Sequence, residues 1–299
     1  MRTGVVFPQT EIEMDAGAVR EWTRAVEAMG FSHVVAYDHV LGASTASRPA
    51  WKGPYTAEST FHEPLVLFSF MAGVTSRLGF LTGIVILPQR QTALVAKQAA
   101  SLDVLSGGRL RLGVGTGWNE VEYEALGVAF ASRGARYDEQ IEVLRALFAR
   151  PAVTFHGAYH TISDAGINPL PLQRPLPIWM GGGADSPLTG QPASDKVLRR
   201  IARVADGWFV LWQPDERGRE LLARFHGYVK DAGRDPAAIG VEGRLDARRA
   251  DAERWAERAG AWAAIGASHL CVNTMGDGLR GAAQHLARLE ELRKALPAG

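Results

Sequence analysis

The stretch LRLGVGTGWNE at residues 110–120 decides how this chain is interpreted, because an apolar strand pattern runs directly into a glycine-rich turn. The dinucleotide fingerprint G-x-G-x-x-G needs a glycine at its sixth position, where Trp118 or Glu120 stands in the two possible frames. The dinucleotide reading therefore fails. We expect that the small residues let the main chain of this turn come close to a neighbouring group. A tight strand-to-helix turn without a ligand is the alternative. The glycines concerned are Gly113, Gly115 and Gly117.

Short apolar runs alternate with helical patterns on both sides of this stretch, and eight of the runs are apolar on both faces, as in a covered parallel sheet. Eight strand–helix units in about 250 residues favour a closed (β/α)8 TIM barrel. A doubly wound open sheet is the alternative, because periodicity alone does not show closure. The predicted strands are residues 3–7, 33–37, 78–87, 109–115, 178–180, 207–211, 239–244 and 269–273.

One segment interrupts the alternation. Residues 153–172, VTFHGAYHTISDAGINPLPL, alternate in polarity and carry turn residues, which predicts a β-hairpin rather than a further domain. We therefore expect a single domain over residues 1–299, with a hairpin insertion at about 151–175 after the fourth strand.

Composition excludes several classes of function. The chain has 33 Lys and Arg residues against 32 Asp and Glu, so nothing marks it for nucleic acid or an anionic membrane. Its one cysteine, Cys271, lies in an apolar run and is expected to be buried, which fits a reducing compartment. No apolar stretch suits a signal peptide or a membrane span, and no histidine has metal-ligand spacing. These features predict a cytoplasmic protein without a metal site.

Two strand ends carry candidates for chemistry, since ligands of barrels meet the carboxyl ends of strands. Asp38 and His39 follow the second strand and combine a carboxylate with a side chain that moves protons near neutral pH. A capping Asp and a packed His are the alternative. Gly181, Gly182 and Gly183 follow the fifth strand and could present N–H groups to a phosphate, with a short helix in 184–194 and the cations Lys196, Arg199 and Arg200 nearby. A flexible turn and a solvated helix face are the alternatives.

These strand ends resemble those of the bacterial luciferase-like oxidoreductases, specifically the branch that uses the deazaflavin coenzyme F420. The resemblance covers nearly the whole chain in order and is most specific over residues 75–127. It implies a TIM barrel with an insertion after strand four, a small-molecule substrate and a homodimer. The matching segments are YDHV at 37–40, TSRLGFLTGIVILPQRQTALVAKQAASLDVLSGGRLRLGVGTGWNEVEYEALG at 75–127, YDEQIEVLRALF at 137–148, PLPIWMGGG at 175–183 and ADGWF at 205–209.

The resemblance also implies roles for individual residues. Asp38 would contact the edge of the flavin-like ring, and His39 would lie near the hydride-bearing carbon as a proton donor or a stabiliser of the reduced anion. A bulge in strand three, with a non-prolyl cis peptide at Gly83–Ile84, would back the ring. The remaining implied contacts are Thr82, Gly83, Ile84 and Val85 with the ring, Thr116, Gly117 and Trp118 with the ring or its ribityl chain, and Gly181, Gly182 and Gly183 with the phosphate.

The function that follows is hydride transfer between coenzyme F420 and a small organic substrate. An FMN-dependent monooxygenase of the same superfamily is the first alternative, and a non-catalytic flavin-binding barrel is the second. The loop at residues 42–61, with Trp51 and Tyr55, is expected to act as a lid over the substrate, with a mobile surface loop as the alternative.

Overall fold

The computed structural model describes residues 1–183, 193–248 and 251–296. Its strands are β1 (Arg2–Val6), β2 (His33–Ala36), β3 (Gly79–Thr82), β4 (Val85–Ile86), β5 (Leu110–Gly115), β6 (Val153–His156), β7 (Thr161–Ala165), β8 (Ile178–Gly181), β9 (Gly207–Phe209), β10 (Gly240–Asp246) and β11 (His269–Asn273). Its helices are α1 (Ala16–Ala28), α2 (Pro64–Ala72), α3 (Thr92–Ser106), α4 (Glu120–Ala125), α5 (Arg133–Ala149), α6 (Asp195–Val204), α7 (Glu216–Asp231), α8 (Ala252–Ala264) and α9 (Gly281–Ala295).

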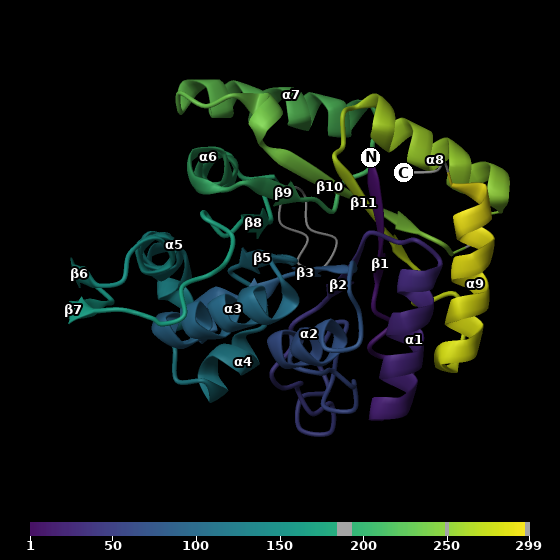
Figure 1. The fold of residues 1–299 in the computed structure, drawn as a ribbon, viewed down its shortest axis with the longest axis horizontal. Coiled ribbons are helices and arrows are strands. Elements are labelled where there is room, and N and C mark those ends of the chain that lie inside the picture. The colour runs from purple at the N-terminus through teal and green to yellow at the C-terminus, as the bar shows by residue number, and fades with distance from the viewer. Residues whose placement is uncertain (184–192, 249–250, 297–299) are drawn as a thin grey trace.

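The parallel strands close into a barrel. The pairing runs β1–β2–β3–β5–β8–β9–β10–β11, and β11 pairs with β1 again. The contact that completes the circuit is between β3 and β5, where Phe80 lies opposite Leu110. Helices surround the strands, and the antiparallel β6–β7 hairpin projects from the side near α5 (Figure 1). The predicted TIM barrel is confirmed, and the open sheet is excluded by the closed pairing.

Strand three differs from its prediction as one continuous run over 78–87. The peptide bond between Gly83 and Ile84 is cis, as the resemblance implies, and it separates β3 from β4. A 3-10 helix over Leu87–Gln89 then ends the strand, because Pro88 has no N–H to donate to a neighbouring strand.

The glycines of β5 and of the turn after it receive this interrupted strand. A Cβ atom built on Gly113 would overlap the carbonyl oxygen of Thr82, and one on Gly115 would overlap the side chain of Ile84. A Cβ on Gly117 would lie 2.7 Å from Ile86. The alternating glycines therefore admit the neighbouring strand, which is the close approach that the sequence left unassigned.

The interior of the barrel is layered. A buried apolar cluster of Val6, Val35, Leu81, Trp179, Phe209 and Cys271 fills its middle. Towards the amino ends of the strands, Glu242 is fully buried and contacts Nε2 of His33 at 2.5 Å and Nη1 of Arg111 at 2.8 Å. Burial would raise the pKa of Glu242, but the charges of His33 and Arg111 lower it to about 2.

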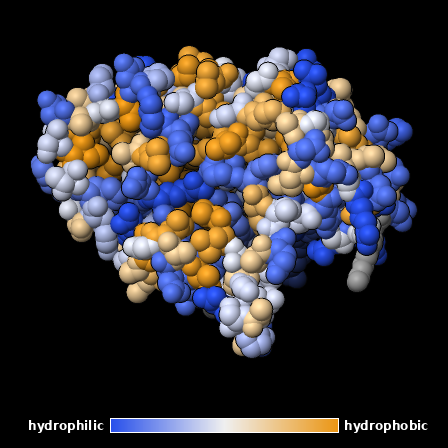
Figure 2. Space-filling view, turned by 90° about the horizontal axis from the view of Figure 1, so that it is seen from below, coloured by the Kyte–Doolittle hydropathy of each residue, from blue (hydrophilic) through white to orange (hydrophobic). Residues whose placement is uncertain are grey.

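On the outside, hydrophobic residues gather in patches separated by hydrophilic ones, as the view from below Figure 1 shows (Figure 2). Large exposed hydrophobic side chains of α2 and α3 include Val66, Leu94 and Leu105. Within the described part of the chain, no helix has the length and apolar character that crossing a membrane requires.

Candidate active site

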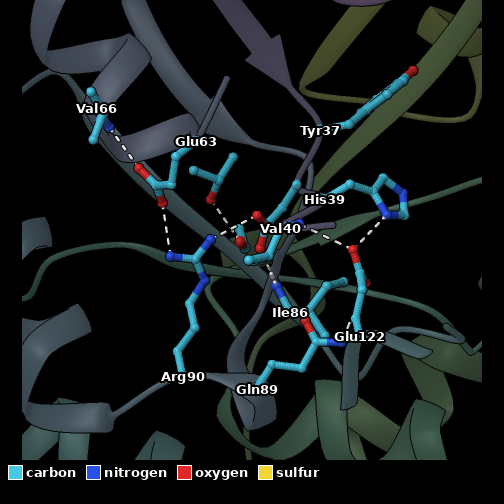
Figure 3. Close-up of polar contacts among 12 residues, drawn as sticks. Tyr37, His39, Val40, Glu63, Val66, Ile86, Gln89, Arg90 and Glu122 are labelled. Carbon is cyan, nitrogen blue, oxygen red and sulfur yellow. Dashed lines mark hydrogen bonds and ion pairs between the residues drawn. The ribbon is translucent and has the colours of Figure 1, made fainter. Parts of the chain in front are cut away.

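The residues predicted at the end of strand two are brought to the carboxyl-terminal mouth of the barrel, but Asp38 and His39 have different surroundings. Asp38 accepts a hydrogen bond from the N–H of Ile86 at 2.9 Å, and its other oxygen lies 2.7 Å from Nη2 of Arg90. Arg90 also contacts Glu63 at 2.8 Å, and Glu63 caps α2 through the N–H of Val66 (Figure 3). Asp38 thus joins β2 to β4 and α2.

The Asp38 carboxylate is a positioning group in this geometry. Only 1% of its side chain is exposed, and both oxygens have protein partners. Burial raises the pKa of Asp38, while the charge of Arg90 and the N–H of Ile86 act in the opposite direction. Contact between Asp38 and a ring edge stays a prediction, and the sequence did not reveal Arg90 and Glu63 as its partners.

His39 is held by a carboxylate that sequence reasoning missed. Its Nδ1 lies 3.0 Å from Oε1 of Glu122, which also accepts the N–H of Val40 at 3.0 Å. Gln89 donates to the other oxygen at 3.3 Å. Because a carboxylate accepts, we assign the Nδ1 proton to His39, and within residues 1–183, 193–248 and 251–296 its Nε2 contacts no protein partner. Figure 3 shows the imidazole and Glu122 turned toward each other.

Glu122 could have been suspected from its place in NEVE, directly after the glycine-rich turn. Asn119 caps α4 by accepting the N–H of Val121 at 3.1 Å, and Glu122 follows in the first turn with a side chain that is 1% exposed. A buried acid at a helix start next to a strand end is a candidate partner for a strand-end histidine.

Aromatic rings surround the His39 imidazole. The ring centroids of Tyr55, Phe61 and Trp118 lie 4.7, 4.9 and 5.9 Å from that of His39. Trp51 lies 5.8 Å from Trp118 and donates from its indole to the carbonyl of Tyr55 at 3.0 Å. A cavity of about 260 Å³ is lined by His39 and the predicted lid loop. The loop therefore packs over the histidine.

The strand-three residues divide into two pairs. Thr82 and Val85 are fully buried, and the Thr82 hydroxyl donates to the carbonyl of Gly113 at 2.6 Å. Gly83 and Ile84 are partly exposed, and they are the two of these four that can offer surface to a ligand. Thr82 and Val85 are instead part of the buried packing that holds the bulge of strand three.

The predicted ribityl contacts lie at the rim. Thr116, Gly117 and Trp118 are all partly exposed. The Thr116 carbonyl accepts a hydrogen bond from the Tyr123 hydroxyl at 2.6 Å, which fixes the turn after β5.

The triple glycine has a defined backbone. Gly182 and Gly183 have φ values of 114° and 83°, which glycine alone adopts readily. The Gly182 carbonyl accepts the indole N–H of Trp208 at 2.8 Å, and the Gly183 carbonyl accepts the N–H of Ser194 at 3.1 Å. Phosphate binding here stays a prediction. Residues 184–192, where a short helix was expected, lie outside the described residues.

The nearby arginines are engaged by acids. Arg200 is 7% exposed and lies 2.5 Å from Asp138, whereas Arg199 lies 3.5 Å from Asp231. The buried contact favours a structural role for Arg200, whereas Lys196 and Arg199 are both exposed.

A larger groove of about 540 Å³ lies away from this chemistry, at the carboxyl ends of α5 and α6. Two of its arginines are engaged by protein: Arg145 contacts Asp206 at 2.6 Å, and Arg234 donates to the carbonyls of Ala202 and Ala205 at 2.8 and 2.7 Å. It is a site of helix capping, so the mouth of the barrel remains the candidate active site.

Comparison with known proteins identifies the family of the chain. The model of the family described as luciferase-like monooxygenase matches residues 1–298. The chain belongs to this family. Among luciferase-like relatives, an uncharacterized protein of Mycobacterium tuberculosis is 40% identical over 221 residues, 71% of each chain. An FMNH2-dependent dimethylsulfone monooxygenase of Pseudomonas putida is 32% identical over 152 residues, 50% of this chain and 39% of that protein.

The solved structures show the same luciferase-like fold. An F420-dependent secondary alcohol dehydrogenase, solved with an F420–acetone adduct, superimposes with a TM-score of 0.77 at 17% identity and covers 99% of both chains. The protein is therefore a member of the luciferase-like monooxygenase family with the TIM barrel of these structures.

The mouth of the barrel fits a tricyclic cofactor. Ile84 and Gly83 offer a partly exposed apolar surface beside Gly115 and Gly181, where side chains are small. The positive φ values of Gly182 and Gly183 give a backbone turn whose N–H groups can serve an anionic group. The residues present therefore suit a ring on one wall and a phosphate at its edge.

Proposed function

We propose that this protein is a coenzyme F420-dependent oxidoreductase that transfers a hydride between the deazaflavin and a small organic substrate. The observation that carries the proposal is the His39–Glu122 pair at the mouth of the barrel. Reduction of a carbonyl, or oxidation of an alcohol, moves one proton for each hydride, and an oriented imidazole is suited to move it near neutral pH.

Each residue of the pair has a distinct task. The bound deazaflavin supplies or accepts the hydride. Glu122 holds Nδ1 of His39, so that Nε2 is free to give a proton to a substrate oxygen or to take one from it. Tyr55, Phe61 and Trp118 pack around the imidazole and exclude water from this transfer.

An FMN-dependent monooxygenase is the second candidate, and the similarity to the Pseudomonas putida monooxygenase favours it. A non-catalytic flavin-binding barrel is the third candidate, and the His39–Glu122 pair speaks against it because binding alone has no need of an oriented acid–base group.

Titration of the purified protein with F420 and with FMN, followed by fluorescence, separates these candidates. We expect tighter binding of F420. Tight FMN binding without F420 binding would overturn the proposal in favour of the monooxygenase.

The His39→Ala variant then tests catalysis. Its F420 affinity should be close to that of the wild type, while turnover falls about 10²–10⁴-fold, the usual contribution of a general acid or base. Unchanged turnover would remove His39 from the mechanism, and absence of turnover in the wild type over a panel of alcohols and carbonyls would favour the binding protein.

A further inference from the structure

The mouth of the barrel has two chemically different halves. Ile84 and Phe209 stand on the half formed by β4, β5, β8 and β9, together with glycines of β5 and β8. The half formed by β2, β10 and β11 is polar. Its inward-facing residues follow from register: Arg244 lies opposite Cys271 of the interior cluster, and Asp246 lies opposite Asn273 two residues further on.

The guanidinium of Arg244 is oriented by Asp246. Nε and Nη2 of Arg244 both contact Oδ1 of Asp246, at 3.1 and 2.8 Å, and Asn273 donates to the same oxygen at 2.7 Å. The Arg244 side chain is 24% exposed, so it borders space that a ligand can reach.

The other end of the guanidinium points away from Asp246 and has donors left for a ligand. Among the residues that the structure describes, Nη1 of Arg244 contacts no acceptor, and Nη2 has one N–H left after binding Asp246. Parallel N–H groups on Nη1 and Nη2 match the two oxygens of a planar acceptor, which is the geometry of bidentate carboxylate binding.

The Tyr37 hydroxyl adds a second donor to this half. Its oxygen is buried and has no hydrogen-bond partner within residues 1–183, 193–248 and 251–296. Figure 3 shows Tyr37 extending away from Arg90 and Glu63, and it packs on the interior cluster that contains Cys271. A buried hydroxyl without a partner is costly, and a ligand oxygen at this place would satisfy it.

Tyr55 connects the surroundings of Arg244 with those of His39. Burial raises the pKa of both Tyr37 and Tyr55, and the positive charge of Arg244 opposes the rise in each case, which places both hydroxyls within its field. The Tyr55 ring in turn packs on His39 at 4.7 Å. A small molecule between Arg244 and His39 would therefore meet a cation at one end and a proton-transfer group at the other.

We propose that Arg244, oriented by Asp246, binds a carboxylate of the substrate with the Tyr37 hydroxyl as an additional donor, so that the enzyme acts on small carboxylic acids. That the bound molecule is a substrate rests on the proposed function. The donor set itself does not, because it is defined by Arg244, Asp246 and Tyr37 alone.

Ligand-observed saturation-transfer NMR on the full-length protein, with and without F420, tests the donor set. The probes are benzoate with benzamide and butyrate with butyramide, and butane-1-sulfonate tests a non-planar anion. We expect each carboxylate to bind at least about tenfold more tightly than its amide. An equal affinity for acid and amide, or a preference for the sulfonate, would overturn the proposal.

Variants locate the effect. Arg244→Gln should abolish the preference for the acid. Arg244→Lys keeps the positive charge but lacks the two parallel N–H groups, so it should keep part of the preference. Arg254→Gln removes an exposed charge from α8 and should leave the preference intact. Retention of the full preference in a folded Arg244→Gln protein, judged by circular dichroism, would refute the role of Arg244. The Lys variant decides the question if the Gln variant does not fold.

A measurement of F420 affinity separates this inference from the proposed function. F420 affinity, followed by its fluorescence, should be the same in Arg244→Gln as in the wild type. A parallel loss of F420 affinity would place Arg244 at the cofactor and overturn the inference. A wild type that binds no F420 but discriminates acid from amide through Arg244 would overturn the proposed function and leave only the carboxylate-binding donor set standing.

Discussion

Oε1 of Glu122 accepts hydrogen bonds from Nδ1 of His39 and from the N–H of Val40, each at 3.0 Å. One oxygen of α4 thereby fixes both the ring and the backbone of the loop after β2. His39 and Glu122 are 83 positions apart, and the pairing of β3 with both β2 and β5 brings them together.

Glu122→Gln should lower kcat by roughly 10–100-fold, because an amide can still accept from Nδ1 but lacks the charge that stabilises a protonated imidazole. Steady-state kinetics checks this, with F420 affinity measured alongside. Glu124→Gln is the matched control, since Glu124 lies exposed on the same helix. Equal kcat in the two variants would contradict a role for Glu122 in proton transfer.

Gly113→Ala should destabilise the protein by about 1–3 kcal/mol, because the added methyl group overlaps the backbone carbonyl of Thr82. Urea unfolding followed by circular dichroism measures the change. Gly227→Ala in α7 is the control: no atom lies within 4 Å of its added Cβ, and helix propensity should make it neutral or stabilising by up to about 1 kcal/mol. A Gly113→Ala protein as stable as the wild type would show that β3 is free to shift.

Trp51→Ala should reduce turnover more than F420 affinity. The indole packs on Trp118 and fixes the Tyr55 carbonyl, so its loss loosens the loop that covers His39. Stopped-flow kinetics and fluorescence titration give the two quantities. A loss of the same size in both would argue against a lid.

Acid should weaken the barrel interior. Glu242 has its pKa lowered from 4.5 to about 2, so its contribution is present above pH 4.5 and is lost as pH falls towards 2. Burial and the charge of Arg111 lower the pKa of His269 from 6.5 to about 3, so the unfolded chain takes up a proton first and stability falls between those values. We expect the free energy of unfolding to decrease from pH 6.5 downward by a few kcal/mol.

His269→Gln should flatten the part of this decrease between pH 6.5 and 3, as measured by urea unfolding at several pH values. His156→Gln is the control, because His156 is exposed on β6. An identical pH dependence in both variants would exclude His269 as a source of acid sensitivity.

The sequence was sufficient for the barrel because each strand is short, apolar on both faces and followed by a helix, which is a local property. It was also sufficient to place His39 at a strand end. The residue pattern predicted strand three as one continuous run, since an apolar run gives no local sign of the break between β3 and β4, and only the resemblance implied a bulge at Gly83–Ile84.

The pairing of the site residues was not predicted from the sequence, and the reason is physical. Glu122 meets His39 and Arg90 meets Asp38 from different strand–helix units, and periodicity fixes the face of an element but not which distant side chain meets it. Asp38 illustrates this: adjacent to His39 in sequence, it binds Arg90 and Ile86 in space, while Glu122 serves the histidine.

The close packing of Gly113 and Gly115 in β5 against Thr82 and Ile84 has a consequence for engineering this protein. Ile84 fills the space that Gly115 leaves, so volume at the two positions is shared and one can grow only if the other shrinks. A mutant library that varies these strands one residue at a time would discard most changes as misfolded. Exchanging bulk in pairs, as in Ile84→Ala with Gly115→Val, would move the wall of the pocket from one strand to its neighbour and reshape it without enlarging the core.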